Sequence, residues 1–117
     1  MTDRIVYKVM STAELAAMRR DGAFRGSAAD VADGYIHLSR AVQLAGTLDK
    51  HFAGQAGLVL VAVDLSQLGD TVRWEPSRGG QLFPHIHGVL PIEAVTWAGP
   101  VERTPDGGVA LPGEAGH

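Results

Sequence analysis

The feature that most constrains the fold of this chain is an uninterrupted apolar run, Leu58-Val59-Leu60-Val61-Ala62-Val63. Successive residues of a strand point to opposite faces, so a strand made of this run is apolar on both faces. A strand of that kind is buried on both sides. We therefore expect residues 58–63 to form the central strand of a sheet.

The length of the chain sets the number of cores it can build. With 117 residues, 45% of them hydrophobic and 20% charged, the composition is that of one globular domain. A domain of this size buries roughly two thirds of the surface that its unfolded chain exposes. We expect a single domain over residues 1–117, with its core at about residues 5–100 and a flexible tail from 104 to 117.

Shorter patterns place further elements on either side of the apolar run. Apolar segments bounded by turn residues predict strands at residues 5–10, 35–38, 71–75 and 94–98. A capping box of Ser11 and Glu14 predicts a helix that ends near Gly22, and Ser39 can cap a second helix running to Phe52. Segments 25–30 and 77–88 are expected to be loops. The pattern favours an α+β fold with a small mixed or antiparallel sheet and two main helices.

Charge and composition exclude several classes of function. With 10 Lys and Arg against 13 Asp and Glu, the net charge of −3 is unlike that of a protein that binds a long nucleic acid. The absence of cysteine excludes disulfides, a thiolate nucleophile and Cys-ligated metal sites. No segment has the length of apolar sequence that a membrane helix needs, and no signal peptide is evident. We expect a cytoplasmic protein with no membrane partner, either a monomer or a homodimer.

Three histidines, His37, His85 and His87, fall on or beside elements where their side chains can converge. Histidine serves as a proton carrier, hydrogen-bond donor or metal ligand near neutral pH. In an extended segment His85 and His87 point to the same face, and with His37 they would supply three nitrogen ligands. A metal-free cleft is preferred over this metal site, because no supporting carboxylate or HExxH helix is evident. His51, near the end of a helix, is given no functional role.

Positively charged and small residues indicate a site for an anion. Arg78 stands beside Gly79 and Gly80, where a guanidinium and a bare backbone can approach a phosphate or carboxylate together. Lys8 in an apolar strand and the segment Arg25-Gly26-Ser27 add two positive groups and a hydroxyl. We expect a small phosphorylated or carboxylated ligand. No Rossmann, P-loop or G-x-S-x-G motif is present.

Seven short motifs occur in order along the chain: Ile5-Val6-Tyr7-Lys8, Gly26-Ser27, Asp33-Gly34-Tyr35-Ile36-His37-Leu38-Ser39, His51-Phe52, Arg73-Trp74-Glu75-Pro76, Arg78-Gly79-Gly80 and Phe83-Pro84-His85. Their order resembles that of the DUF952 family of small bacterial proteins of unknown function, over about residues 5–100. The resemblance implies an ADP-ribosyltransferase-like fold. It therefore also implies NAD as a cofactor or substrate and a transferase activity.

In that superfamily a strand histidine followed closely by Ser or Thr holds the ribose of NAD, and His37-Leu38-Ser39 resembles this element. Tyr35 or Trp74 would supply the aromatic residue beside the nicotinamide. Glu75 and His85 are the candidates for the residue that acts on the acceptor. Together with the residue patterns, the resemblance gives His37, His85 and Glu75 as catalytic candidates, and as substrate-binding candidates Lys8, Arg25, Ser27, Ser39, Trp74, Arg78 and Gly79.

Four hypotheses about function stay open from the sequence. The first is a domain that binds NAD, ADP-ribose or a related phosphoester, with transferase or hydrolytic activity. The second is a ligand-binding module without catalysis, and the third is a metal-dependent enzyme that uses His37, His85 and His87. The fourth is an interaction protein, such as a homodimer formed through an edge strand.

Overall fold

The central strand predicted from the apolar run is confirmed. The computed structural model describes residues 4–111, except for the side chain of Arg78. Strand β4 (Leu58–Asp64) lies between β1 (Ile5–Ser11) and β8 (Val95–Pro100), and both pairings are antiparallel. Val61 and Val63 belong to a core on one face of this sheet, and Leu60 and Ala62 to a core on the other. Burial on both faces is what the sequence of the run requires.

A second sheet has the order β3-β6-β5 and is also antiparallel. It consists of β3 (Ile36–His37), β5 (Val72–Pro76) and β6 (Leu82–Ile86). The prediction of a loop across residues 77–88 is therefore wrong for its second half. Glycines and a proline suggested a loop, but residues 83–86 are buried, and the glycines only bound the strand, in the turn η4 (Arg78–Gly80) and at Gly88.

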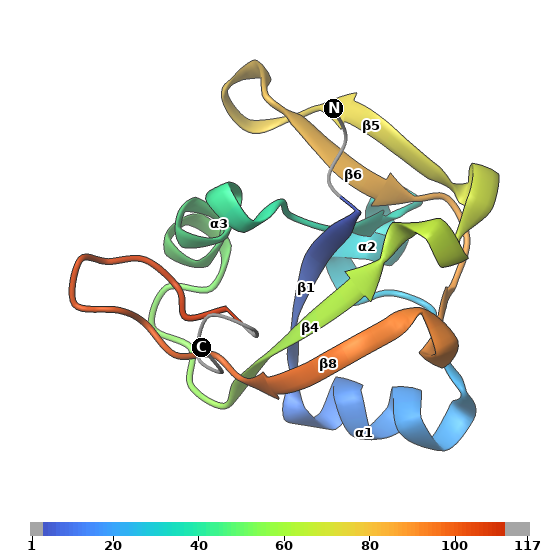
Figure 1. Cartoon of the computed structure of the whole chain (residues 1–117), viewed down its shortest axis with the longest axis horizontal. Helices are drawn as coiled ribbons and strands as arrows, with labels where there is room; N and C mark the ends of the chain where they lie inside the picture. Colours follow the sequence, from blue (N-terminus) through green and yellow to red (C-terminus); the bar gives the residue numbers. More distant parts are fainter. Residues whose placement is uncertain (1–3, 112–117) are drawn as a thin grey trace.

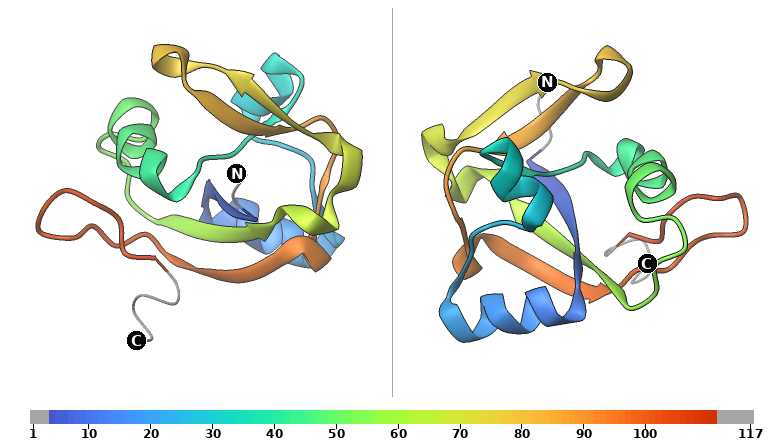
Figure 2. Two further views of the ribbon diagram at one scale, coloured as in Figure 1. Left: turned by 45° about the horizontal axis from the view of Figure 1, so that its top comes forward. Right: turned by 180° about the vertical axis from the view of Figure 1, so that it is seen from behind.

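The two sheets meet at residue 39. The backbone amides of Tyr7 and Ser39 each donate to the other residue's carbonyl oxygen, at 2.8 Å in both directions. Just before this point, the amide of Leu38 donates to the carbonyl of Pro84 in β6 at 3.0 Å. The segment that carries His37 is thus hydrogen-bonded to both sheets, and Figure 1 and Figure 2 show β5 and β6 on one side of the β1-β4-β8 sheet.

Helix α1 (Thr12–Asp21) confirms the capping box predicted at its start. The Ser11 side chain accepts from the Glu14 amide, the Glu14 side chain accepts from the Ser11 amide, and Gly22 ends the helix with φ of 82°. Leu15 and Met18 are the buried residues of this helix. A minor pair of strands, β2 (Ala23–Phe24) and β7 (Leu90–Pro91), follows at the same end of the molecule.

Helix α2 (Ala28–Asp33) occupies part of the segment expected to be a loop, which corrects that prediction. Ser27 and Asp30 form a second capping box, with Asp30 in the position that Glu14 has in α1. Gly34 ends the helix with φ of 88°, a conformation that favours glycine. The small residues between Ser27 and Asp30 concealed a helix of only six residues.

The second predicted helix is shorter than expected and is not capped by Ser39. A short 3-10 helix, η1 (Ala41–Gln43), follows Arg40 and leads into α3 (Leu44–His51). The backbone of Ser39 pairs with β1 instead, which prevents it from starting a helix. Leu44 and Leu48 of α3 pack with Tyr7, Val9 and Leu60 in the second core.

The remaining segments are short. They are the 3-10 helices η2 (Leu65–Gln67), η3 (Gly69–Thr71) and η5 (Ile92–Ala94), and a turn closed by a bridge between Arg103 and Val109. Of the segment expected as a tail, Val109 and Leu111 pack against the second core, whereas residues 112–117 lie outside the described part. Within residues 4–111, no helix is long and apolar enough to cross a membrane. The architecture is compatible with α+β, and α2 adds a third helix to the two expected.

The capping box of α1 gives a test of the fold. Replacing Ser11 by Ala removes the acceptor for the Glu14 amide and is expected to lower the free energy of unfolding by about 1 kcal/mol, measured by urea denaturation. Thr12→Ala, at an exposed position in the first turn, is the matched control and should cause no loss. Equal stability of the Ser11→Ala variant and the unmodified protein would contradict the assigned cap.

Candidate functional site

A buried carboxylate, Asp30, connects the first strand to the segment that carries His37. Its oxygens lie 2.9 and 3.1 Å from Nζ of Lys8, and the amides of Ser27 and His37 donate to it at 2.9 and 3.1 Å. Its Oδ1 is also 2.6 Å from Nδ1 of the His37 ring. Lys8 and Asp30 are both buried. The capping box at the start of α2 positions the Asp30 carboxylate between the Lys8 ammonium and the His37 imidazole.

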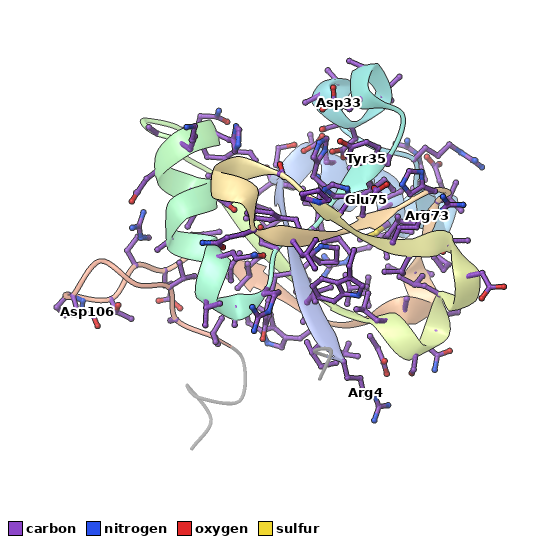
Figure 3. The ribbon with its side chains drawn as sticks, turned by 90° about the horizontal axis from the view of Figure 1, so that it is seen from above. Arg4, Asp33, Tyr35, Arg73, Glu75 and Asp106 are labelled. Carbon is purple, nitrogen blue, oxygen red and sulfur yellow. The ribbon has the colours of Figure 1, made fainter. Side chains whose placement is uncertain are left out.

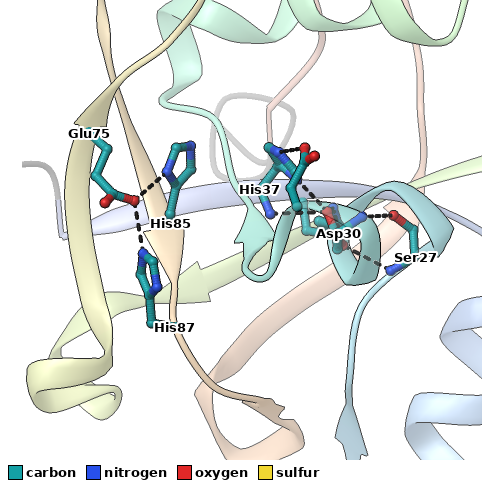
Figure 4. Close-up of polar contacts among 8 residues, drawn as sticks. Ser27, Asp30, His37, Glu75, His85 and His87 are labelled. Atoms are coloured by element: carbon teal, nitrogen blue, oxygen red, sulfur yellow. Dashed lines mark hydrogen bonds and ion pairs between the residues drawn. The ribbon is translucent and has the colours of Figure 1, made fainter.

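The hydrogen bonds to Asp30 determine its charge. Burial raises the pKa of this carboxyl, but the bond from His37, the nearby Lys8 ammonium and the Ser27 amide lower it more, so the pKa lies well below its ordinary value. Asp30 is therefore an ionised acceptor, and Nδ1 of His37 is the donor to it. Figure 4 shows the contacts of Asp30 with Ser27 and His37.

The other nitrogen of His37 also meets a carboxylate. Nε2 lies 3.0 Å from Oδ2 of Asp33, in the last turn of α2, and the side chains of His37 and Asp33 are 34% and 54% exposed. A carboxylate oxygen only accepts, so a carboxylate beside each ring nitrogen favours a proton on both of them. The ring of His37 thus lies between the buried carboxylate of Asp30 at Nδ1 and the exposed carboxylate of Asp33 at Nε2.

A second carboxylate, Glu75, bridges the other two histidines of the cluster. Its Oε1 lies 2.8 Å from Nδ1 of His85 and 2.8 Å from Nε2 of His87. Figure 4 shows both contacts. The bonds from His87 and His85 lower the pKa of Glu75. The sequence prediction that His85 and His87 share one face of an extended segment is confirmed, since both reach the same oxygen.

The environment of His85 differs from that of His37. Only 2% of its side chain is exposed, and this burial lowers its pKa, although the hydrogen bond with Glu75 opposes the effect. His85 is thus a neutral ring whose Nδ1 donates to ionised Glu75. Its Nε2 carries a lone pair as a consequence.

Aromatic and imidazole rings pack together between these carboxylates. The ring of Tyr35 stacks on His85 with centroids 4.2 Å apart, and it lies 4.8 Å from His37 and 5.2 Å from His87. The centroids of His37 and His85 are 5.4 Å apart, because these residues are direct partners in the β3-β6 ladder. Figure 3 shows Asp33, Tyr35 and Glu75 near one another, far from Arg4 and Asp106.

A cleft with a volume of about 450 Å³ opens beside this cluster. Five of the residues singled out from the sequence lie in its wall: Lys8, Ser27, His37, Ser39 and His85. Residues that the sequence did not assign to a site also line it: Glu14, Asp30, Asp33, Thr47, His51, Phe52, Gln55, Ser77 and Phe83. The cleft therefore brings together residues from β1, α2, β3, α3 and β6.

Four of the sequence candidates do not line the cleft: Arg25, Trp74, Glu75 and Gly79. Arg25 is exposed, Trp74 packs against the first core, and Glu75 acts on His85 from the far side. The side chain of Arg78 lies outside the described part of the chain. Gly79 does not line the cleft, and the anion site expected around Arg78 stays a prediction.

Asp30 is the site residue that sequence reasoning missed. The signal that could have found it is the sequence Ser27-Ala28-Ala29-Asp30, which has the spacing of a capping box. His51 was explained by its place near a helix end, yet its side chain reaches the cleft. Ser39 and Thr47 face each other there, with their hydroxyl oxygens 2.8 Å apart.

The histidines do not form a metal site in the part of the chain that the structure describes. Between residues 4 and 111, no group of three or more His, Asp or Glu side chains is arranged to hold a metal ion. His85 and His87 share a carboxylate, and Nδ1 and Nε2 of His37 both face carboxylates. The hypothesis of a metal-dependent enzyme therefore gains no support from these residues.

The buried pair of Lys8 and Asp30 predicts a pH-dependent stability. Because the pKa of Asp30 is lowered in the folded chain, its stabilisation is complete above the ordinary aspartate pKa of about 3.9 and is lost as the pH falls toward the lowered value. Asp30→Asn leaves the Lys8 ammonium buried without its partner and should cost about 3–5 kcal/mol in urea unfolding at neutral pH. The exposed Asp70→Asn variant is the control.

The double variant Lys8→Met with Asp30→Asn tests the cause of that loss. Since it removes the unpaired ammonium as well, it should regain much of the lost stability and show a shallower decline at acid pH than the unmodified protein. A double variant as unstable as Asp30→Asn alone would contradict the assigned ion pair.

Solved structures of a related protein match the chain. The crystal structure of protein CC0527 from Caulobacter crescentus is 45% identical, with a TM-score of 0.82, and the match covers 92% of this chain and 94% of that one. A crystal structure of a double mutant of CC0527 gives 44% identity and the same TM-score of 0.82, again over 92% and 94% of the two chains. The solution NMR structure gives 43% identity and a TM-score of 0.77 over 97% of both chains. All three are structural genomics targets.

The sequence also matches a defined family. No curated protein matches the chain. Residues 9–98, which make up most of its length, match the family described as "Protein of unknown function (DUF952)". The family expected from the order of the sequence motifs is thus confirmed, and this protein belongs to the DUF952 family.

Proposed function

We propose that this protein binds a phosphorylated ribonucleotide of the NAD and ADP-ribose class in the cleft. The observation that carries the proposal is His37, which lies in the cleft wall with Nδ1 fixed by the buried Asp30 carboxylate. A ring oriented in this way presents its other edge to a ligand in a defined direction. The resemblance of His37-Leu38-Ser39 to the ribose-holding element of the ADP-ribosyltransferase-like superfamily supports the same ligand class.

The size and lining of the cleft suit a small nucleotide. Its volume of about 450 Å³ falls within the usual range of small-molecule sites. Phe52 and Phe83 offer apolar surface for a base, and the hydroxyls of Ser39 and Thr47 offer donors and acceptors for a sugar or phosphate. Asp33 can accept from ribose hydroxyls. The net charge of −3 disfavours a long nucleic acid, which agrees with a ligand of this size.

A second candidate is a module that binds such a ligand without transferring ADP-ribose. Glu75, the carboxylate considered for the acceptor step, does not line the cleft, and both of its histidine contacts use one oxygen. ADP-ribosyl transfer would therefore need another carboxylate, and Glu14 and Asp33 in the cleft wall are the candidates. An assay for release of nicotinamide from NAD distinguishes the two candidates, because only the transferase would release it.

Calorimetric titration tests the proposed binding. Of NAD, ADP-ribose and adenosine 2′-monophosphate, at least one should bind at a single site per chain. His37→Ala removes the oriented imidazole and should weaken that binding by about tenfold or more, as expected for the loss of a charge-assisted hydrogen bond. Asp106→Asn, on a turn far from the cleft (Figure 3), is the matched control.

Two results would contradict the proposal. One is the absence of binding by all three compounds. The other is equal binding by the His37→Ala variant and the unmodified protein, because the ligand would then occupy a different part of the surface.

A further inference from the structure

His37 and His85 stand opposite each other at the cleft. They are direct partners in the β3-β6 ladder, both line the cleft, and their ring centroids are 5.4 Å apart. Partners in a ladder point to the same face of the sheet. Two imidazoles from neighbouring strands therefore line the same cleft.

Each of these rings is held at the same atom by a different carboxylate. Asp30 of α2 holds Nδ1 of His37, and Glu75 of β5 holds Nδ1 of His85. In a histidine oriented through Nδ1, the Nε2 atom is the one that exchanges a proton with a substrate. Within residues 4–111 no hydrogen bond uses Nε2 of His85, and Nε2 of His37 meets only the exposed side chain of Asp33.

The surroundings of the two rings favour different numbers of protons. His37 has a carboxylate beside each ring nitrogen, whereas His85 is buried and has a carboxylate beside Nδ1 only, which leaves a lone pair on Nε2. The pKa of His85 is lowered by burial and by the neighbouring His37 and His87, against the effect of Glu75. When the surroundings of two adjacent titratable groups favour opposite protonation states, one group usually acts as the general acid and the other as the general base.

We infer that His85 and His37 are a general base and a general acid that hydrolyse a phosphodiester of a small ribonucleotide, of which a 2′,3′-cyclic phosphate is the simplest. This inference rests on the proposed function, because it requires that the cleft binds a phosphorylated ribonucleotide. It adds a reaction and a substrate class to that binding.

The reaction balances with water as the only other reactant. Nε2 of His85 takes a proton from water, and the water oxygen forms a bond to phosphorus. The bond between phosphorus and one ribose oxygen breaks, and Nε2 of His37 gives its proton to that oxygen, which leaves as a hydroxyl. The product is a ribonucleotide monophosphate, and the two rings then return to their first protonation states by exchange with solvent.

Water rather than a side chain serves as the nucleophile. Ser39 and Thr47 are two of the hydroxyls in the cleft wall, and their oxygens are hydrogen-bonded to each other at 2.8 Å. An alkoxide is a poor leaving group, so the reaction needs an acid at the ribose oxygen as well as a base at the water. The Asp33 carboxylate would give up its place at Nε2 of His37 to this oxygen.

The test uses adenosine 2′,3′-cyclic phosphate and follows the product by phosphorus NMR. The full chain should convert it to a single adenosine monophosphate isomer. His37→Gln and His85→Gln should each lower kcat by about 10²–10⁴-fold, the usual contribution of one acid or base. Asp106→Asn, far from the cleft, should keep the full rate. Circular dichroism and thermal unfolding of each variant establish that it is folded.

The possible failures are distinguishable. If the cyclic nucleotide binds in calorimetry but stays intact, this inference is wrong and the proposed binding function stands. If it turns over equally in the His85→Gln variant, the assignment of the base is wrong. If neither it nor the nucleotides named above bind, the proposed function fails together with the inference.

Glu75 is the positioning residue in this scheme, and a pH profile tests its role. The charged and titratable groups that face His85 are Glu75, His87, His37 and Tyr35. Since kcat rises with pH as His85 loses its proton, and Glu75 favours the protonated ring, Glu75→Gln should move the acid limb of the profile to lower pH. A purely structural residue would lower kcat without moving this limb, and that result would overturn the assignment.

Discussion

The arrangement of the site depends on one buried ion pair, Lys8 with Asp30. Lys8 comes from an otherwise apolar strand of the first sheet, and Asp30 comes from the short helix α2. A buried ammonium without a partner is strongly destabilising, so the carboxylate must lie where it does for β1 to pack. The same carboxylate accepts from the amide and the ring of His37, and the pair therefore fixes the second sheet's histidine relative to the first sheet.

The chemical difference between the two facing histidines follows from their surroundings. His37 is partly exposed between two aspartates, while His85 is buried beneath Tyr35 and supported by one glutamate that it shares with His87. Burial and the number of carboxylate contacts thus give different chemical environments to two identical side chains whose ring centroids are 5.4 Å apart. This difference in environment is the basis for assigning the two histidines different roles in a reaction.

The elements with strong local signals were predictable from the sequence. The apolar run of β4 and the Ser11-Glu14 capping box are such signals. Helix α2 and strand β6 were not predicted, because one is six residues long and the other is bounded by glycines and contains Pro84. Short elements of this kind are stabilised by tertiary contacts, which a local pattern does not contain.

The same distinction applies to the candidate site. The residue types of Lys8, His37 and His85 were enough to single them out, and the fold places all three at the cleft. Asp30 could not be found from the chemistry of its neighbours, because its partner Lys8 is 22 residues away and only the fold brings the two together. For Glu75 the sequence suggested a role in acceptor chemistry, but the register of β5 and β6 directs its carboxylate to the histidines behind the cleft.

The central claim is that the two facing imidazoles differ in protonation because different carboxylates and different burial surround them. Nitrogen-15 NMR of histidine-labelled protein, followed as the pH is lowered, measures this directly, since the shifts of Nδ1 and Nε2 report which nitrogen carries a proton. The account predicts a proton on Nδ1 of His85 while its Nε2 is bare, and protonation of Nε2 of His37 at a higher pH than Nε2 of His85. Protonation of both Nε2 atoms at the same pH, or of His85 first, would contradict it.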